Sequence, residues 1–454
     1  MALGRGWAVG LLAFCGLAHA QEPATPSTRP TPVQASDPAT TPPALPVARI
    51  DPAPAAPFRI GGVVQFDVVN YALPQSVRSN LPGSSPLEDA VTFRRVRLNV
   101  GGSIDQAVDY FAEINFVDSL LPDLTTNSVR DVPAPTALWV TFRDLPVGNL
   151  RVGQQRPPLS FEHLAGGTNL PLFERSLGYD AFVENFNNGY EPGILLFDTF
   201  ADRRGTWAFG AFKNTHSLYA YNIGRNEHEL TGRVTGLPVD ADGGRTLVHV
   251  GVGGTYRDLD DDAQRFRARP SIRNTVSALG PLLADTGAVY GSRQAIVVPE
   301  LVVVRGPLSV QCEYYGSWLT DARPASAPGG PAGTVFFQAV TAEAGYLLTG
   351  EARQYDRDAG VFERVVPAEN VRWRKGFGRE GAGVWQAAAR LTYLDLNDKG
   401  IEGGQVYDLT LGLTWYLNPN LKIQTNYSLT YRNAPGTAGD GYINAVGTRL
   451  AVEY

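Results

Sequence analysis

The chain ends in AVGTRLAVEY (residues 445–454), which alternates between apolar and polar positions as a β-strand with two different faces does. Val446, Leu450 and the terminal Tyr454 fall on one face, and Arg449 falls on the other. A terminal strand with a free edge would promote aggregation, and closure of the sheet into a barrel removes that edge. The segment therefore indicates the closing strand of a β-barrel. The last strand of a soluble β-sandwich is the alternative that this pattern alone leaves open.

The composition favours many strands rather than membrane-spanning helices. The 454 residues include 49 glycines and 10% aromatic residues, and the formal net charge is −6. After residue 20, no uncharged apolar stretch reaches the roughly 18 residues that a transmembrane helix requires. A membrane protein without such helices must be a closed barrel, because lipid cannot satisfy free backbone groups. Nothing in the sequence indicates a nucleic-acid partner.

Three regions follow one another along the chain. Residues 1–20 have the features of a secretory signal peptide, with Arg5 before an apolar core and Ala-His-Ala as the cleavage site, so the chain is expected to leave the cytoplasm. Residues 21–57 are rich in Pro, Ala and Thr, and we expect a disordered linker there. Residues 58–454 carry the strand patterns and form the expected barrel domain.

The barrel domain contains about sixteen segments with period-2 alternation, which predicts an all-β, antiparallel transmembrane barrel. Short and long connections alternate between the segments, but 349–382 is long where a short turn is expected. We therefore expect part of 349–382 to fold into the lumen, while the loops 156–191 and 257–294 narrow the pore from the other end. The predicted strands are 58–70, 91–104, 108–117, 136–143, 148–155, 192–200, 205–213, 227–236, 246–256, 295–305, 307–318, 335–348, 383–395, 405–417, 421–431 and 443–454.

Several local strings resemble signature segments of one family, the phosphate-selective porin O and P family, and occur in the same order as they do there. They are FRRVRL (93–98), LRVGQ (150–154), FER (173–175), YLLTGEAR (346–353) and GVWQAAARL (383–391). The resemblance implies a sixteen-stranded homotrimeric barrel, surrounded by the lipid of a Gram-negative outer membrane, that takes up anions passively. It also implies that the barrel-assembly machinery reads the last strand through its terminal aromatic residue, here Tyr454.

The expected function is thus a water-filled channel for small anionic or neutral solutes. A more specific expectation is a preference for phosphate-like anions. A surface adhesion or structural barrel without a transport role is the alternative. The sequence has no HExxH or paired-ligand spacing for a metal and no GxSxG nucleophile elbow, so neither a metal, a cofactor nor an enzymatic activity is expected.

Arginines are the candidate residues for an anion path, because a guanidinium is always charged and binds oxyanions through two hydrogen bonds. Alternation places Arg95 and Arg97 on the inner face. Carboxylates such as Glu113, Glu343 and Asp408 also face inward, so ion pairs that brace the wall are the alternative role. The candidates are Arg59, Arg95, Arg97, Arg151, Arg265, Arg267, Arg269, Arg273, Arg372, Arg374, Lys375 and Arg390.

Overall fold

A computed structural model gives the fold of the barrel domain. The expected signal peptide and linker (residues 1–57) lie outside the part of the chain that the structure describes, as do Arg374 and Lys375. None of the helices among the described residues is long and apolar enough to cross a membrane. The described residues are 58–83, 86–117, 120–123, 128–131, 133–184, 189–213, 228–259, 263–274, 280–324, 333–373, 379–434 and 439–454.

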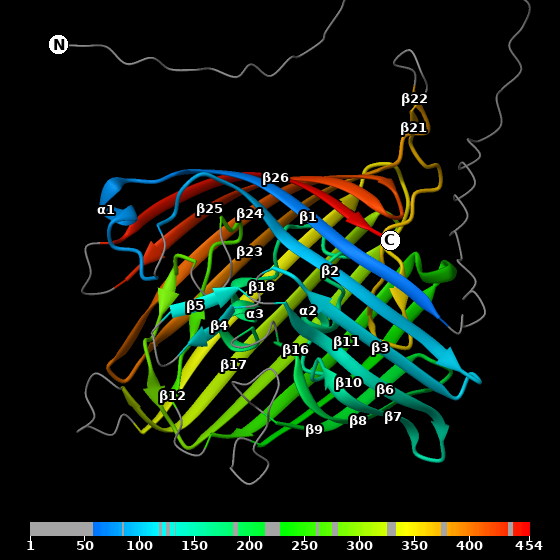
Figure 1. The fold of residues 1–454 in the computed structure, drawn as a ribbon, viewed down its shortest axis with the longest axis horizontal. Coiled ribbons are helices and arrows are strands. Elements are labelled where there is room, and N and C mark those ends of the chain that lie inside the picture. Colours follow the sequence, from blue (N-terminus) through cyan, green and yellow to red (C-terminus); the bar gives the residue numbers. More distant parts are fainter. Residues whose placement is uncertain are drawn as a thin grey trace, which may run out of the picture. The chain divides into compact units, whose positions relative to one another are not determined.

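Sixteen long strands form one antiparallel sheet in which each strand pairs with the next along the chain and the last pairs with the first (Figure 1). All sixteen predicted segments correspond to these strands, so the predicted fold is confirmed. The strands are β1 Arg59–Ala72, β2 Ala90–Ile104, β3 Val108–Asn115, β6 Ala134–Leu145, β7 Gly148–Gln155, β8 Glu191–Phe200, β9 Gly205–Lys213, β10 His228–Ala241, β11 Thr246–Asp258, β16 Arg293–Arg305, β17 Leu308–Pro324, β18 Gly333–Leu347, β23 Val384–Asp398, β24 Ile401–Asn418, β25 Leu421–Asn433 and β26 Gly441–Glu453.

The two ends of the barrel domain close the sheet. Strand β26 pairs with β1 in a regular register that runs from Val63 opposite Glu453 to Ala72 opposite Asn444. The terminal Tyr454 extends this ladder, because its carbonyl oxygen accepts a hydrogen bond from the Gly62 nitrogen at 2.9 Å. A Cβ atom at Gly62 would lie 2.6 Å from the Tyr454 hydroxyl, so glycine leaves the space that the tyrosine ring occupies.

The alternation that predicted the strands separates an apolar outer face from a mixed inner face. On β26, Val446 and Leu450 are exposed on the outside, whereas Ala445 and Arg449 are buried inside. Exposed large apolar side chains recur on the outer face of the other strands, among them Phe93, Leu98, Leu138, Val152, Ile194, Phe209, Val252, Leu301, Leu391 and Leu411. A continuous apolar outer face of this kind is typical of a barrel that contacts lipid.

Two long loops fold into the lumen rather than over its mouth. The loop 156–190 carries the short helices α2 (Phe161–Leu164) and α3 (Leu177–Phe182). Phe182 of α3 packs on Phe266 of the loop 259–292, with ring centroids 6.0 Å apart, and on Tyr315 of β17 at 6.2 Å. Part of the lumen is therefore filled by a hydrophobic core. The loop 259–292 contains β12 Ala263–Gln264, β13 Arg267–Ala268, β14 Ala284–Asp285 and β15 Val289–Tyr290, and the connection between β3 and β6 contains β4 Leu120–Asp123 and β5 Ser128–Asp131.

The connection from β18 to β23 also enters the lumen, as predicted. Its first hairpin pairs β19 (Tyr355–Asp356) with β20 (Val361–Phe362). The Phe362 ring meets the Phe161 ring of α2 edge-on at 5.1 Å, and the Tyr355 hydroxyl lies 2.6 Å from His249 Nδ1 on β11. The first hairpin therefore packs against both the wall and the loop 156–190.

The second hairpin of the same connection has a different position. It pairs β21 (Arg372–Trp373) with β22 (Arg379–Glu380) and projects away from the barrel beyond the strand ends (Figure 1). Trp373 is 68% exposed, and Arg372 is exposed as well. Of these two hairpins, only the first lies in the lumen, where it can narrow the pore.

Replacing 355–362 with a Gly/Ser segment of equal length should raise the single-channel conductance in planar bilayers. The replacement removes Tyr355 and Phe362 from the lumen, and the widened path carries more ions. Trp373→Ser is the control, because it changes the hairpin that lies outside the barrel and should leave conductance unchanged. A replacement channel that conducts like the wild type would contradict the described position of the first hairpin.

Candidate functional site in the barrel lumen

Two consecutive arginines on β2 point into the lumen because the strand contains a β-bulge. Arg95 is opposite Gln65 of β1 and Phe93 is opposite Phe66, which leaves Arg94 as the extra residue between them. Both guanidiniums are buried on the inner face. Strict alternation predicted an inward Arg95 but missed Arg94. The signal was present in the sequence, because the apolar Phe93 and Val96 are three positions apart. Two outward positions of one strand are an odd number of positions apart only across a bulge.

The Glu174 carboxylate of the loop 156–190 lies among these arginines. Arg94 donates to it through Nε and Nη2, each at 3.0 Å, and Arg95 donates through Nη2 at 3.1 Å. Arg449 of β26 adds a third contact at 2.9 Å. Only 2% of the Glu174 side chain is exposed. Burial alone would raise the pKa of Glu174, but Arg94, Arg95 and the other nearby cations hold it well below its usual range, so the group is ionised.

Arg449 and a further arginine, Arg390, connect this loop to the wall. Arg449 forms a two-point ion pair with Asp67 of β1, with both distances 2.7 Å, and its guanidinium lies 4.4 Å from the centre of the Phe173 ring. Arg390 of β23 donates to the Glu174 backbone carbonyl at 2.7 Å. The FER string, residues 173–175, is therefore one of the points at which the loop is attached to the wall.

A second buried cluster joins the loop 156–190 to the loop 259–292. Asp180 of α3 accepts from the Arg269 backbone nitrogen at 2.6 Å and from Arg269 Nε at 3.0 Å. Arg273 approaches Asp180 at 3.2 Å and Glu184 at 3.5 Å. Arg269 and Arg273 thus join the two loops through ion pairs. These are two of the arginines that the sequence suggested for an anion path.

The remaining predicted arginines are distributed between ion pairs and exposed positions. Arg97 pairs with Glu113 at 3.0 Å, and Arg265 pairs with Asp285 through two hydrogen bonds of 2.8 and 2.5 Å. Arg267 of β13 is half-buried, and burial followed by the neighbouring Arg269 lowers its pKa to about 10.

Two candidates lie away from the lumen and two are not described. Arg59 is exposed at the start of β1, and Arg372 is exposed on the outer hairpin. Arg374 and Lys375 lie outside the described residues. No finding tests the anion-path role of the twelve candidates, which stays a prediction. The contacts of Arg97, Arg265 and Arg269 match the alternative role of bracing ion pairs.

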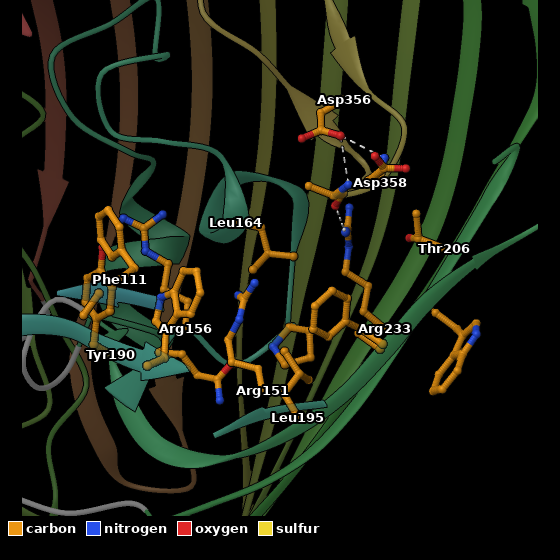
Figure 2. Close-up of a pocket in the computed structure, with 18 residues that line it drawn as sticks. Phe111, Arg151, Arg156, Leu164, Tyr190, Leu195, Thr206, Arg233, Asp356 and Asp358 are labelled. Atoms are coloured by element: carbon orange, nitrogen blue, oxygen red, sulfur yellow. Dashed lines mark hydrogen bonds between the residues drawn. The ribbon is translucent and has the colours of Figure 1, made fainter. Parts of the chain in front are cut away.

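A cavity of about 420 Å³ lies between the loop 156–190, the first inner hairpin and the inner face of β3–β10 (Figure 2). Most of its lining side chains are apolar, and they include Phe111, Trp139, Leu164, Tyr190, Leu195 and Phe197. This side of the lumen differs from the Glu174 side, where charged groups dominate.

Arg151 and Arg156 bring positive charge to the cavity. The Arg151 guanidinium lies 4.0 Å from the centre of the Trp139 ring and 5.0 Å from that of Phe197, and its Nε donates to Thr141 at 2.9 Å. Arg156 Nη1 donates to two backbone carbonyls of the loop at 3.0 and 3.1 Å. Neither guanidinium forms an ion pair with a carboxylate of the described chain. Alternation does not identify Arg156, because this residue begins a loop and belongs to no alternating pattern.

The carboxylates at the cavity already have partners. Asp358 forms a two-point ion pair with Arg203 at 2.7 and 2.6 Å, and Asp356 accepts from the backbone nitrogens of Asp358 and Ala359 at 2.8 and 3.1 Å. Among the described residues that line it, the cavity therefore presents two cations without a carboxylate partner, Arg151 and Arg156, and one carboxylate without a cationic partner, Asp356.

A family model for the phosphate-selective porin O and P family matches residues 58–454. The chain belongs to this family. Porin O of Pseudomonas aeruginosa is 25% identical to it over 417 residues, which cover 85% of this chain and 86% of that protein. An uncharacterised protein of Caulobacter vibrioides is 28% identical over 471 residues, which cover 95% of this chain and 86% of that protein. Membership identifies the barrel as an outer-membrane porin, and the family is one of channels rather than enzymes.

Similar barrels occur among solved structures. A loop-deletion mutant of OmpT from Vibrio cholerae has a TM-score of 0.49 at 11% identity, with 87% of this chain and 99% of that chain covered. OprB of Pseudomonas putida has the same TM-score at 10% identity, with 87% and 94% covered.

Arg94→Gln should lower the thermal stability of this porin by about 1–3 kcal/mol, because Glu174 stays buried but loses its two-point partner. The shift can be measured as the temperature at which the folded barrel changes its electrophoretic mobility. Arg143→Gln is the control, since Arg143 pairs with Asp109 at an exposed position and such pairs contribute under about 1 kcal/mol. Equal stability of the two variants would contradict the buried contact of Arg94.

Proposed function

We propose that this porin passes small hydrophilic solutes with a mild preference for anions. The observation that carries the proposal is the charge balance at the 420 Å³ cavity. Arg151 and Arg156 have no carboxylate partner there, Asp358 is paired with Arg203, and Asp356 is the one carboxylate of the described lining without a cationic partner. A solute responds to the charges of the lumen wall rather than to the net charge of the chain, so a formal charge of −6 is compatible with anion preference.

The lumen has two parts with different tasks in this proposal. The buried cluster around Glu174, together with the pairs of Arg269 and Arg273, keeps the loop 156–190 in place and sets the free cross-section. Arg151 and Arg156 then supply the positive potential along the open side. Arg97 and Arg265 contribute less, because each has a carboxylate within 3.0 Å.

The remaining parts of the proposal concern delivery and assembly. Residues 1–20 would direct secretion and be removed, and residues 21–57 would form a tether before the barrel. The terminal strand with Tyr454 offers the aromatic end by which the barrel-assembly machinery would recognise the chain, and outer-membrane lipid would surround the apolar face. A homotrimer is the proposed assembly, and one of the similar structures is described as a trimer form of OmpT.

Reversal potentials in a KCl gradient across a planar bilayer test the proposal. The wild-type channel should favour chloride over potassium, and Arg151→Gln should reduce the permeability ratio about twofold, because one cation of the cavity is lost. Arg372→Gln removes the same charge from the exposed hairpin outside the barrel and should leave the ratio near the wild-type value. A wild-type channel that favours potassium would refute the anion preference and leave a general diffusion pore.

A further inference from the structure

The cavity beside the loop 156–190 combines two chemical features, and an inorganic anion would use only one of them. One is positive charge from Arg151 and Arg156, and the other is a set of aromatic rings from the wall strands. A small hydrated oxyanion such as phosphate gains from the charge but loses water against the apolar surface. A ligand that uses both features must carry a negative group and an apolar body.

Arg151 is arranged to bind the negative group. Its guanidinium faces the Trp139 ring at 4.0 Å, and its Nε is occupied by Thr141 at 2.9 Å. Its two terminal nitrogens donate to no described protein atom and are open to the cavity. A guanidinium that packs over an aromatic ring and donates to a neighbouring hydroxyl keeps a fixed direction, so the two open nitrogens can bind a carboxylate through two hydrogen bonds.

The aromatic rings form a surface for the apolar body. Phe111 stacks on Trp139 with centroids 5.6 Å apart and an angle of 23° between the rings, and the centre of the Phe197 ring lies 5.0 Å from the Arg151 guanidinium. Tyr190 and Leu195 complete the lining nearby. Aromatic rings that line a cavity bind another ring through edge-to-face or offset contacts and by burial of apolar area. The volume of about 420 Å³ falls in the range of small-molecule sites.

The nearby carboxylates do not oppose such a ligand. Asp109 is paired with Arg143, and Asp358 is paired with Arg203. Asp356 keeps its charge and accepts from two backbone nitrogens, but Arg151 and Arg156 outnumber it at the cavity. Charge complementarity at this side of the lumen therefore favours a monoanion over a cation of the same shape.

We propose that this cavity is a binding site for small organic anions that carry a carboxylate on an aromatic ring, and that the porin favours their passage over that of inorganic anions. The inference rests on the proposed anion preference and specifies its solute class. Such a site binds weakly enough to release its solute, as conduction requires. Binding should appear as partial block of the chloride current while the anion occupies the cavity.

Benzoate is the probe, with acetate and inorganic phosphate as comparisons, in single-channel recordings of the full chain in KCl. Benzoate should reduce the chloride current at a concentration about tenfold lower than acetate or phosphate requires. Trp139→Leu should raise the half-blocking concentration of benzoate about tenfold, because the stacking surface is lost, and Phe197→Leu should raise it in the same direction. Trp385→Leu is the matched control, since Trp385 stacks on Trp415 on the outer face of the barrel, and should leave the block unchanged.

The outcomes separate this inference from the proposed function. A chloride-favouring channel that phosphate blocks at the same or a lower concentration than benzoate would overturn the inference alone. Equal benzoate block in the wild type and in both the Trp139 and Phe197 variants, each folded as judged by heat-dependent mobility, would also overturn it. A potassium-favouring wild type would instead refute the anion preference on which the inference rests.

Discussion

The lumen is organised by one buried carboxylate, Glu174, and the arginines that neutralise it. Taking a carboxylate and several guanidiniums out of water costs several kcal/mol per ion, and the arrangement is stable only because nearly every donor finds an acceptor. Arg94, Arg95 and Arg449 contact the carboxylate, while Arg390 holds the backbone carbonyl of the same residue. These arginines come from β2, β23 and β26, so the loop 156–190 can take this position only after the barrel has closed.

This constraint divides the lumen into two sides. On the side of β23–β26 and β1–β2, ion pairs and the packed aromatic rings of α3 leave little space for solutes. On the side of β3–β10, the same loop forms one wall of the 420 Å³ cavity, and the inner hairpin closes its edge with Asp356 and Asp358. The position of the loop therefore decides both the width of the path and which side chains a solute meets. Arginine has opposite uses on the two sides, as a bracing partner of carboxylates and as an open donor.

The sequence predicted the fold well because strand position depends on a local property. Period-2 alternation located all sixteen strands, and the parity of loop lengths identified the connection that re-enters the lumen. The prediction of side-chain direction from alternation failed where a β-bulge interrupts the regular strand. The bulge at Arg94 shifts the phase of β2, so an arginine that strict alternation assigns to lipid faces the lumen.

The sites depend on contacts that no local pattern encodes. Arg449 and Asp67 are 382 residues apart in the chain and become partners only through barrel closure. Sequence alone placed arginines on the inner face but left open whether they pair with carboxylates, and for Arg97, Arg265 and Arg269 the structure shows that they do. Arg156 lies in a loop without any period, so only the folded chain shows that it borders the cavity.

The most direct test of the central claim is the single-channel conductance of Glu174→Gln compared with Glu113→Gln. Both substitutions remove one negative charge from the lumen, but only Glu174 holds the loop 156–190, whereas Glu113 pairs with Arg97 within the wall. The account predicts a larger and noisier conductance for Glu174→Gln, because the segment of the loop around residue 174 loses its ion pairs with β2 and β26 and restricts the path less. Conductance and noise that are the same in both variants would contradict the claim that this carboxylate sets the pore.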